Sequence, residues 1–376
     1  MASASETEST SGFLTEQLRA QIRRNGPMSF HDWMRAALYD QAHGYYCRAD
    51  RVRQGRTGDY RTAPETSPLF AATFARFFRK LFAELGSPER WTICEVGAGS
   101  GDFAFDVLST LQKRHPSVFD ATRYVIDEVS PQARTRAFDR LVQFDDRIEF
   151  QSLVEVQEPF DFGIIFSNEL IDAFPVHRVI RRGGELRELY VGLTNGGFTW
   201  AERDLSPAIG DYCRRSEIEL VEGQIIEVNL EAEEFISRAA SSLKEGFVIT
   251  IDYGAERKEL LSAAQRRSGT LRAFRQHQLV DDVLSHPGEQ DLTTTIDWTQ
   301  IREAGEHAGL ETIRHQRLDQ FLLNEGLLQE LQASTSDLSE SEVVRLRTSA
   351  RELVMPHGLA ASFQVLIQQK SSSDPP

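Results

Sequence analysis

The chain has 376 residues, of which 40% are hydrophobic and 26% are charged, and its mean hydropathy is -0.38. This length exceeds the roughly 100–200 residues of a single domain, so we expect a folded core domain that carries large additions. The formal net charge of -15 argues against a general affinity for nucleic acid or anionic membrane, and it favours a basic partner.

The cysteines, the histidines and the two ends of the chain further limit the class of protein and its location. Cys47, Cys94 and Cys213 lie far apart without a CxxC pair, so the sequence predicts neither a disulfide framework nor a zinc site. The histidines include no HExxH motif, and we expect no metal. No signal-peptide pattern and no apolar run of ~18 residues is present. We therefore expect a cytoplasmic protein without a membrane span, with disordered tails at residues 1–12 and 371–376.

Helical patterns come first along the chain. Apolar residues at spacings of three and four predict an N-terminal helical cap over residues 13–88, which contains a long irregular loop. From residue 89 onward, short apolar runs alternate with helical ones, including WTICEV, a helix over 101–114, RYVIDE, a helix over 131–141 and FDFGIIFS. This alternation predicts an α/β fold with a doubly wound parallel sheet over residues 89–370.

Two segments interrupt the alternation. Residues 176–218 begin with three β-type runs separated by Gly-Gly and Asn-Gly-Gly, which predicts an antiparallel β insertion. Residues 255–304 show little periodicity, and we interpret them as a second insertion that faces the substrate. The run FQVLIQQK near the end predicts a last strand.

The stretch ICEVGAGSGDF places three glycines, Gly97, Gly99 and Gly101, directly after a predicted strand. A dinucleotide fingerprint requires its third glycine at position 102, where this chain has Asp102, and the lysine of a phosphate-binding P-loop is missing. Ser100 lacks the flanking glycines of a nucleophile elbow. A ligand that needs close backbone approach but carries no pyrophosphate fits best, and a tight turn without a ligand is the alternative. S-adenosylmethionine is such a ligand.

Two carboxylates support this interpretation. Glu95 precedes the glycines and Glu128 ends the next predicted strand, as in the E-x-G-x-G-x-G pattern of class I methyltransferases. In that pattern the second acid accepts hydrogen bonds from the ribose hydroxyls, which are charge-assisted and therefore strong. Because Asp127 lies next to Glu128, the sequence leaves open which of the two faces the ribose.

The chain resembles the MidA-like class I methyltransferases, a family that includes a mitochondrial assembly factor that methylates an arginine of a respiratory complex I subunit. The resemblance spans residues 26–370 and rests on seven blocks in the family's order: GPMSFHDWMRAALYDQAHGYY, GDYRTAPETSPLF, EVGAGSG, SNELIDAFPVHR, IDYG, GTLRAFRQH and PGEQDLTTTIDW. It implies S-adenosyl-L-methionine as cofactor and a protein substrate. The expected cofactor-binding residues are Glu95, Gly97, Ala98, Gly99, Gly101, Glu128, Asn168, Gly58 and Thr62.

The block FSNELIDAFPVHR follows the fourth predicted strand and supplies the candidate catalytic residues Asn168, Glu169 and Asp172. A spacing of three brings Glu169 and Asp172 onto one side of a helical turn. An arginine guanidinium, with a pKa above about 12, must be held by carboxylates that accept a proton during methyl transfer. We expect Glu169 in this role, assisted by Asp172 or Asn168. The alternative is that Asn168 caps a short helix and the acids are solvated.

The loop GDYRTAPETS is the next candidate, because its glycine and hydroxyl residues suit a segment that folds over the cofactor. Its acids Asp59 and Glu65, with His43 and Tyr46 from HGYY, are the expected substrate-binding residues. A solvated linker and aromatic packing between helices are the alternatives.

Two functional classes remain open. The first is a protein arginine methyltransferase, and the second is an assembly or scaffold protein that keeps the fold without the chemistry. A small-molecule substrate is a further alternative within the enzyme class, since the fold alone does not decide the substrate.

Overall fold

The computed structural model describes residues 4–48, 67–262, 266–276, 278–335, 338–355 and 358–372. It divides into two compact units, each built from several stretches of chain. The first unit comprises residues 1–53, 171–233 and 255–300, and the second comprises residues 54–170, 234–254 and 301–376. Both predicted insertions therefore contribute chiefly to the first unit.

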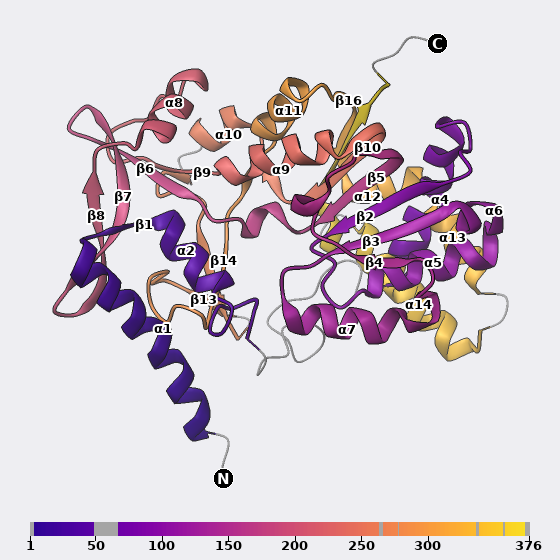
Figure 1. Ribbon diagram of the computed structural model, residues 1–376, viewed down its shortest axis with the longest axis horizontal. Helices are drawn as coiled ribbons and strands as arrows, with labels where there is room; N and C mark the ends of the chain where they lie inside the picture. Colours follow the sequence, from indigo (N-terminus) through magenta and orange to yellow (C-terminus); the bar gives the residue numbers. More distant parts are fainter. Residues whose placement is uncertain are drawn as a thin grey trace. The chain divides into compact units, whose positions relative to one another are not determined.

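The second unit contains a seven-stranded sheet in the order β16-β17-β10-β5-β2-β3-β4 (Figure 1). The five strands from β10 to β4 are parallel neighbours, whereas β17 is antiparallel to both β10 and β16. The strands are β2 (Trp91–Val96), β3 (Thr122–Asp127), β4 (Ile148–Phe150), β5 (Phe160–Asn168), β10 (Leu243–Asp252), β16 (Glu311–Arg317) and β17 (Gln364–Lys370). The predicted α/β fold is confirmed, including the last strand.

Helices connect these strands and cover the sheet. They are α4 (Pro68–Glu84), α5 (Asp102–Arg114), α6 (Pro116–Ala121), α7 (Pro131–Leu141), α12 (Leu318–Asn324), α13 (Leu327–Ser334) and α14 (Glu340–Val354), with short 3-10 turns η1 (Val142–Phe144), η2 (Leu153–Glu155) and η5 (Leu359–Ala361). The helix α7 begins where the sequence predicts, because the Ser130 side chain caps its first turn and proline occupies the first helical position.

Phenylalanine rings form the core beside the end of β2. Phe70, Phe74 and Phe78 repeat every four residues on α4, so they lie on one side of that helix, and all three are buried. They contact Phe103 of α5 and Phe166 of β5, whose rings stack with centroids 4.5 Å apart. Burial of one such ring stabilises the fold by about 1.5–3 kcal/mol. The first turn of α5 is therefore firmly supported.

The first unit is built around an antiparallel sheet in the order β1-β7-β6-β9, with β8 paired to β7. The strands of this sheet are β1 (Met28–Ser29), β6 (His177–Arg182), β7 (Glu185–Thr194), β8 (Gly197–Arg203) and β9 (Ile225–Val228). The unit also contains β12 (Arg272–Arg275), β13 (Gln278–Val280) and β14 (Asp291–Thr293), which form a separate three-stranded sheet, and the short strand β15 (Ile296–Asp297). Its helices are α1 (Ala4–Asn25), α2 (Phe30–Tyr39), α8 (Pro207–Arg215), α10 (Arg257–Ser262) and the 3-10 turn η3 (Ile171–Ala173). The antiparallel insertion predicted from the hairpin signals is present.

Three further elements contain a boundary between the units. They are α9 (Leu230–Ser241), β11 (Gly254–Ala255) and α11 (Trp298–His307).

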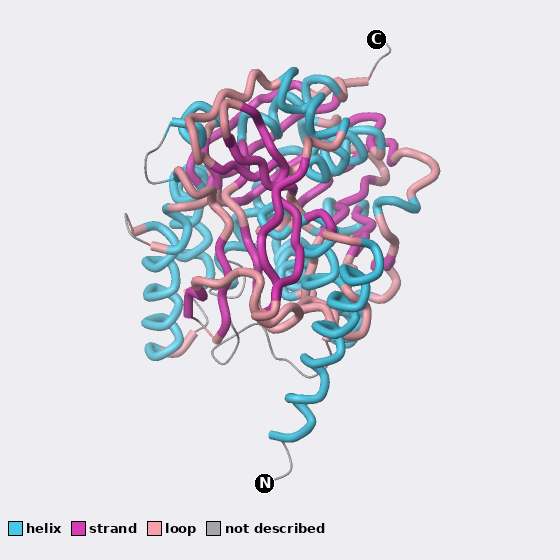
Figure 2. The backbone as a smooth tube through the Cα atoms, turned by 90° about the vertical axis from the view of Figure 1, so that its left-hand side faces the viewer, coloured by secondary structure: helices cyan, strands magenta, loops and turns pink. Residues whose placement is uncertain are grey.

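The N-terminal part differs from the prediction in two ways. The helix α1 begins at Ala4, so part of the tail expected at residues 1–12 is helical. In Figure 2 this is the cyan helix next to the label N. The single cap expected over residues 13–88 is divided, because α1 and α2 belong to the first unit and α4 to the second. Helical periodicity indicates that a helix has a buried face, but it does not indicate which core that face joins.

Candidate functional site

The three glycines of the loop between β2 and α5 share a left-handed backbone, and two of them are also closely packed. Gly97, Gly99 and Gly101 have φ angles of 77°, 57° and 78°, in the region that residues with a Cβ rarely adopt. A Cβ on Gly97 would lie 2.9 Å from Cδ1 of Leu170, and one on Gly101 would lie 3.1 Å from Cα of Ala137. The loop therefore combines a left-handed backbone with close packing, and larger residues would disturb both.

Backbone hydrogen bonds tie this loop to the end of β3. The Gly97 N–H donates to the Asp127 carbonyl at 2.7 Å, and the Gly99 N–H donates to Oε2 of Glu128 at 2.8 Å. The loop also closes on itself, since the Gly101 N–H donates to the Ala98 carbonyl at 3.0 Å. The carboxyl ends of two neighbouring parallel strands thus form one continuous edge, which is where open α/β sheets bind ligands.

The adjacent acids at the end of β3 point to different partners. Besides the Gly99 bond, Glu128 accepts the Ser130 N–H through Oε1 at 2.8 Å, so its carboxylate lies between the glycine loop and the start of α7. Asp127 instead accepts the Leu153 N–H at 2.7 Å, and burial raises its pKa. The geometry therefore places the carboxylate of Glu128, and not that of Asp127, at the glycine loop.

Glu95 lies beneath the loop. Its side chain is buried, and it accepts a hydrogen bond of 2.6 Å from the Tyr124 hydroxyl. Burial raises the pKa of Glu95 to about 8, because a desolvated carboxylate is costly, although the Tyr124 bond partly offsets this. Glu95 is thus a buried residue of β2 that is bonded to Tyr124 of β3, the neighbouring strand.

At the end of β5 the structure departs from the expected helical turn. Asn168 is the last residue of the strand, and Glu169 has a φ of 52°, so Glu169 occupies a left-handed bend ahead of η3. The prediction that Glu169 and Asp172 share one side of a helical turn is therefore wrong. Left-handed residues other than glycine are strained, and such strain is concentrated at functional sites.

Hydrogen bonds fix this bend. The Glu169 N–H donates to the Ile251 carbonyl at 2.9 Å, and Nδ2 of Asn168 donates to Oε1 of Glu169 at 3.2 Å. Oδ1 of Asn168 is buried and has no hydrogen-bond partner among the described residues. An acceptor in that position is suited to a ligand that carries an N–H or O–H donor.

The other expected residues lie in different surroundings. Asp172 belongs to the first unit, where its side chain is buried and its carbonyl accepts the Thr294 N–H at 2.9 Å. His43 stacks on Phe13 with ring centroids 5.9 Å apart, and its Nδ1 is buried without a partner in the described part of the chain. Gly58, Asp59, Thr62 and Glu65 lie outside the described residues.

Tyr46 is integrated into an aromatic and acidic cluster of the first unit. Its ring packs against Tyr39 and Tyr45, with centroids 5.4 Å and 5.2 Å away, and its hydroxyl donates to Oδ1 of Asp291 at 2.7 Å. Asp291 is buried, as is Glu289, which pairs with Arg275 at 2.5 Å. The segment around β14 is therefore not the solvated surface that its polar composition suggests.

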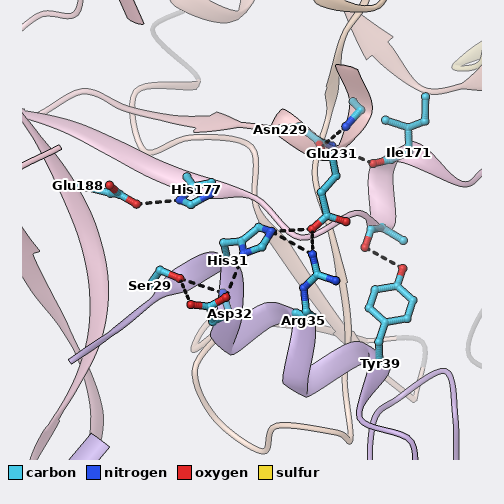
Figure 3. A network of polar contacts seen from close by, with 12 residues as sticks. Ser29, His31, Asp32, Arg35, Tyr39, Ile171, His177, Glu188, Asn229 and Glu231 are labelled. Atoms are coloured by element: carbon cyan, nitrogen blue, oxygen red, sulfur yellow. Dashed lines mark hydrogen bonds and ion pairs between the residues drawn. The ribbon is translucent and has the colours of Figure 1, made fainter. Parts of the chain in front are cut away.

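A second polar network of the first unit centres on two stacked histidines (Figure 3). The rings of His31 on α2 and His177 on β6 lie 4.7 Å apart and nearly parallel. Nε2 of His31 contacts Glu231 at 2.5 Å, its Nδ1 contacts Asp32 at 3.3 Å, and Nδ1 of His177 contacts Glu188 at 2.7 Å. Burial alone would lower the pKa of His31, but the bonds to Asp32 and Glu231 outweigh it and raise that pKa to about 9. His31 is therefore an imidazolium at neutral pH.

Sequence reasoning missed two features near Glu128. Val129 directly follows the acid and is 62% exposed, so its apolar side chain is accessible beside the Glu128 carboxylate. The carboxylate of Asp127 holds the loop around Ser152 and Leu153. The position of Val129 could have been noticed in the sequence, because it directly follows the acid at the end of the predicted strand. Nothing in the sequence links Asp127 to Leu153.

Several features of this edge fit an S-adenosyl compound. The glycine backbone permits close approach, the Glu128 carboxylate can accept hydroxyl donors, and the buried Oδ1 of Asn168 can accept a further donor. Among the described residues, no three His, Cys, Asp or Glu side chains are grouped so that they could hold a metal ion. None of the helices in the described ranges is long and apolar enough to cross a membrane.

Comparisons with known proteins point to the same chemistry. A family model described as "Putative S-adenosyl-L-methionine-dependent methyltransferase" matches residues 73–316. The Protein arginine methyltransferase NDUFAF7 homolog, mitochondrial, of Drosophila melanogaster is 28% identical over 333 residues, which cover 81% of this chain and 73% of that protein. The Protein arginine methyltransferase NDUFAF7, mitochondrial, of Danio rerio is 27% identical over 382 residues, which cover 93% of this chain and 85% of that protein.

A solved structure extends the similarity to the whole fold. The crystal structure of a protein from Burkholderia thailandensis bound to S-adenosyl-homocysteine has a TM-score of 0.85 and 28% sequence identity. It covers 98% of this chain, which in turn covers 94% of that chain. The α/β class I methyltransferase fold and the dependence on S-adenosyl-L-methionine follow from these matches together.

Proposed function

Because the chain belongs to the S-adenosyl-L-methionine-dependent methyltransferase family whose model it matches, we propose that it methylates an arginine guanidinium of a partner protein. Its relatives in Drosophila melanogaster and Danio rerio carry the name protein arginine methyltransferase, which supports this substrate class. The observation that carries the proposal is the left-handed bend at Glu169. Its carboxylate directly follows β5, and the glycine loop directly follows β2, which is the neighbouring parallel strand. A subunit of a respiratory complex is the protein substrate that the family resemblance favours.

Four features of the second unit would hold the cofactor. The backbone of residues 97–101 would lie against its amino acid end, and the Glu128 carboxylate would accept its ribose hydroxyls. Val129 offers an exposed apolar surface for the adenine ring, and Oδ1 of Asn168 is an acceptor for a donor group. When bound, S-adenosyl-L-methionine supplies an activated methyl group on a sulfonium, so the protein itself need only position and activate the acceptor.

Glu169 performs the activation in this proposal. A guanidinium with a pKa above about 12 is a poor nucleophile, because its lone pairs are delocalised and it remains protonated at neutral pH. A carboxylate that binds it in charge-assisted hydrogen bonds localises the positive charge and accepts the proton that leaves as the new N–C bond forms. Asn168 donates to Glu169 and thereby orients this carboxylate.

Replacement of Glu169 tests this role. We expect Glu169→Gln to lower methyl transfer by about 100-fold or more, because general-base contributions are of this size, while its affinity for S-adenosyl-homocysteine stays within about threefold of the wild type. The assay measures transfer of labelled methyl to an array of arginine-containing peptides, each paired with a lysine-substituted copy. Glu158→Gln is the matched control, since Glu158 is an exposed acid of the same unit.

The outcome separates the proposal from its alternatives. Transfer to arginine and lysine copies alike would contradict the substrate class, and normal transfer by Glu169→Gln would contradict the residue's role. Firm cofactor binding without transfer to any protein or peptide would favour the scaffold alternative. Transfer to small molecules alone would instead favour the other enzymatic alternative.

A further inference from the structure

The helix α7 contacts the glycine loop and its acidic partner at three levels. At its start, the Ser130 N–H donates to Glu128, which in turn binds the Gly99 N–H. In its middle, Ala137 packs so closely on Gly101 that a Cβ there would lie 3.1 Å from the helix backbone. In its last turn, Arg140 reaches the residue that follows the loop. One helix thus supports both the loop and the ribose-facing acid.

The contact in the last turn is a chain of three side chains. Oγ of Ser100 donates to Oδ2 of Asp102 at 2.7 Å, and Nε of Arg140 donates to Oδ1 of the same carboxylate at 3.0 Å. Both oxygens of Asp102 are therefore engaged, one by the loop and one by α7. Ser100 has the only side chain larger than a methyl group within residues 97–101, so no other residue of the loop could make such a link to the helix behind it.

Arg140 is itself held in place. Its guanidinium carbon lies 3.5 Å from the centroid of the Phe105 ring, a close cation–π contact, and Phe105 packs against Phe144 with ring centroids 5.9 Å apart. Asp106, one turn after Asp102, adds a second negative charge near Arg140; burial raises the pKa of Asp106 to about 6, and the charge of Arg140 opposes that rise. An arginine stacked on a ring and facing two acids is a rigid anchor.

We propose that Asp102 and Arg140 are positioning residues that hold the glycine loop in its ligand-binding conformation. Three left-handed glycines within five residues are conformationally permissive, so any freedom that the bonds of Gly97 to Asp127 and of Gly99 to Glu128 leave to the loop would have to be lost when the cofactor binds. The Ser100, Asp102 and Arg140 chain orders it beforehand, and pre-ordering increases affinity by removing that cost. The inference concerns the cofactor only and does not depend on arginine as substrate.

The test compares affinity with stability in four variants of the 376-residue chain. Arg140→Gln, Asp102→Asn and the double variant should each weaken binding of S-adenosyl-homocysteine about five- to twentyfold, measured by calorimetry. The thermal midpoint should stay within about 2 °C of the wild type, because side chains that are 41% and 42% exposed contribute little to stability. Arg136→Gln is the matched control, since Arg136 is an exposed arginine on the same helix.

Two further readouts distinguish a positioning role from a simple effect of charge. Loss of positioning weakens neutral S-adenosyl-homocysteine and cationic S-adenosyl-L-methionine equally, whereas a charge effect changes only the affinity for the cation. Amide hydrogen exchange in residues 97–103 should become faster in Arg140→Gln without ligand, because the loop samples more conformations. The double variant should be no weaker than either single variant, since both remove the same link.

The proposal is overturned if the three variants bind S-adenosyl-homocysteine within twofold of the wild type, or if only the cation loses affinity. If Arg140→Gln does not fold, Ser100→Ala removes the loop side of the same chain and should weaken binding about two- to fivefold. An unchanged affinity in Ser100→Ala would then overturn it. Because no arginine is present in these titrations, failure of the substrate proposal leaves their result unaffected.

Discussion

The glycine loop of the second unit and the histidine network of the first unit are built in opposite ways. The loop joins consecutive elements, β2 and α5, and its partner Glu128 follows on the next strand. The histidine network joins α2 to residues far along the chain, since His31 stacks on His177 and is bonded to Glu231, which lies 200 positions away. Local connections leave a spacing that can be read in the sequence, whereas distant ones leave only single residues without a pattern.

The two regions also differ in whether the folded state favours the neutral or the charged form of a titratable side chain. The strand β2, which leads into the loop, carries a buried carboxyl, Glu95, whose pKa is raised to about 8 by burial, so the folded state there favours the neutral form. The network surrounds His31 with acids, so its pKa rises to about 9 and the folded state favours the cation. Below their folded pKa values both groups hold a proton, but one is then neutral and the other is charged.

The largest expected effect concerns packing at the loop. Gly101→Ala adds a Cβ at a φ of 78° and 3.1 Å from the backbone of α7, which cannot move aside as a flexible side chain could. We expect a loss of stability of about 2 kcal/mol and a loss of S-adenosyl-homocysteine binding of about 100-fold. Thermal unfolding and calorimetry measure both. Gly86→Ala is the control, because Gly86 has a φ of 80° but nothing within 4 Å of the added atom.

If Gly86→Ala and Gly101→Ala lost the same stability and affinity, backbone conformation alone would account for the glycines. The close packing between the loop and α7 would then contribute nothing to either quantity.

An intermediate effect is expected from Glu95→Gln. Because the folded pKa of about 8 exceeds the ordinary value of 4.5, the folded state binds an extra proton between these values, and stability falls as pH rises through that window. Glutamine cannot ionise and can still accept the Tyr124 hydroxyl, so the variant should exceed the wild type in stability by on the order of 2 kcal/mol at pH 8.5. Urea unfolding at pH 4.5 and pH 8.5 checks this. A stability difference that is the same at both pH values would contradict it.

A smaller effect on stability is expected from His31→Gln. Here the folded state stabilises a charged group, whereas at Glu95 it destabilises one. A histidine whose pKa is raised from 6.5 to about 9 contributes stability that is fully present below pH 6.5 and is lost as pH rises through about 9. The variant should therefore lose about 1 kcal/mol relative to the wild type at pH 6, a value reduced for solvent screening, and almost nothing at pH 10. Histidine NMR titration and unfolding at both pH values measure this. In a Glu231→Gln background the effect should shrink, and an undiminished effect would show that the acid is not its source.

Prediction from sequence succeeded where local patterns determine structure. WTICEV coincides with β2, and residues 131–141 coincide with α7, because apolar periodicity and the Ser-Pro start signal act within one element. The glycine spacing predicted a tight glycine loop directly after β2, where the structure has three left-handed glycines, and the family resemblance supplied the cofactor, S-adenosyl-L-methionine, which the family match confirms. Glu128 was named together with Asp127, and only the side-chain directions in the structure distinguish them.

Prediction failed where the decisive contacts are not local. The left-handed bend of Glu169 depends on a bond to Ile251, far along the chain, and helical spacing could not reveal it. The pairing of Asp102 with Arg140 joins two helices, and each residue alone resembles an ordinary surface charge. Helices α2 and α4 show the same amphipathic period, yet they belong to different units.

The position of β17 in the sheet has a consequence for how the protein is made. β17 pairs with β10 on one side and β16 on the other, although it follows both along the chain. During synthesis these two strands leave the ribosome before their shared neighbour, so each carries an open hydrogen-bonding edge until residues 364–370 emerge. Open edges pair with other chains and promote aggregation. The sheet is therefore completed late, and we expect a nascent chain to be most prone to aggregation just before β17 inserts.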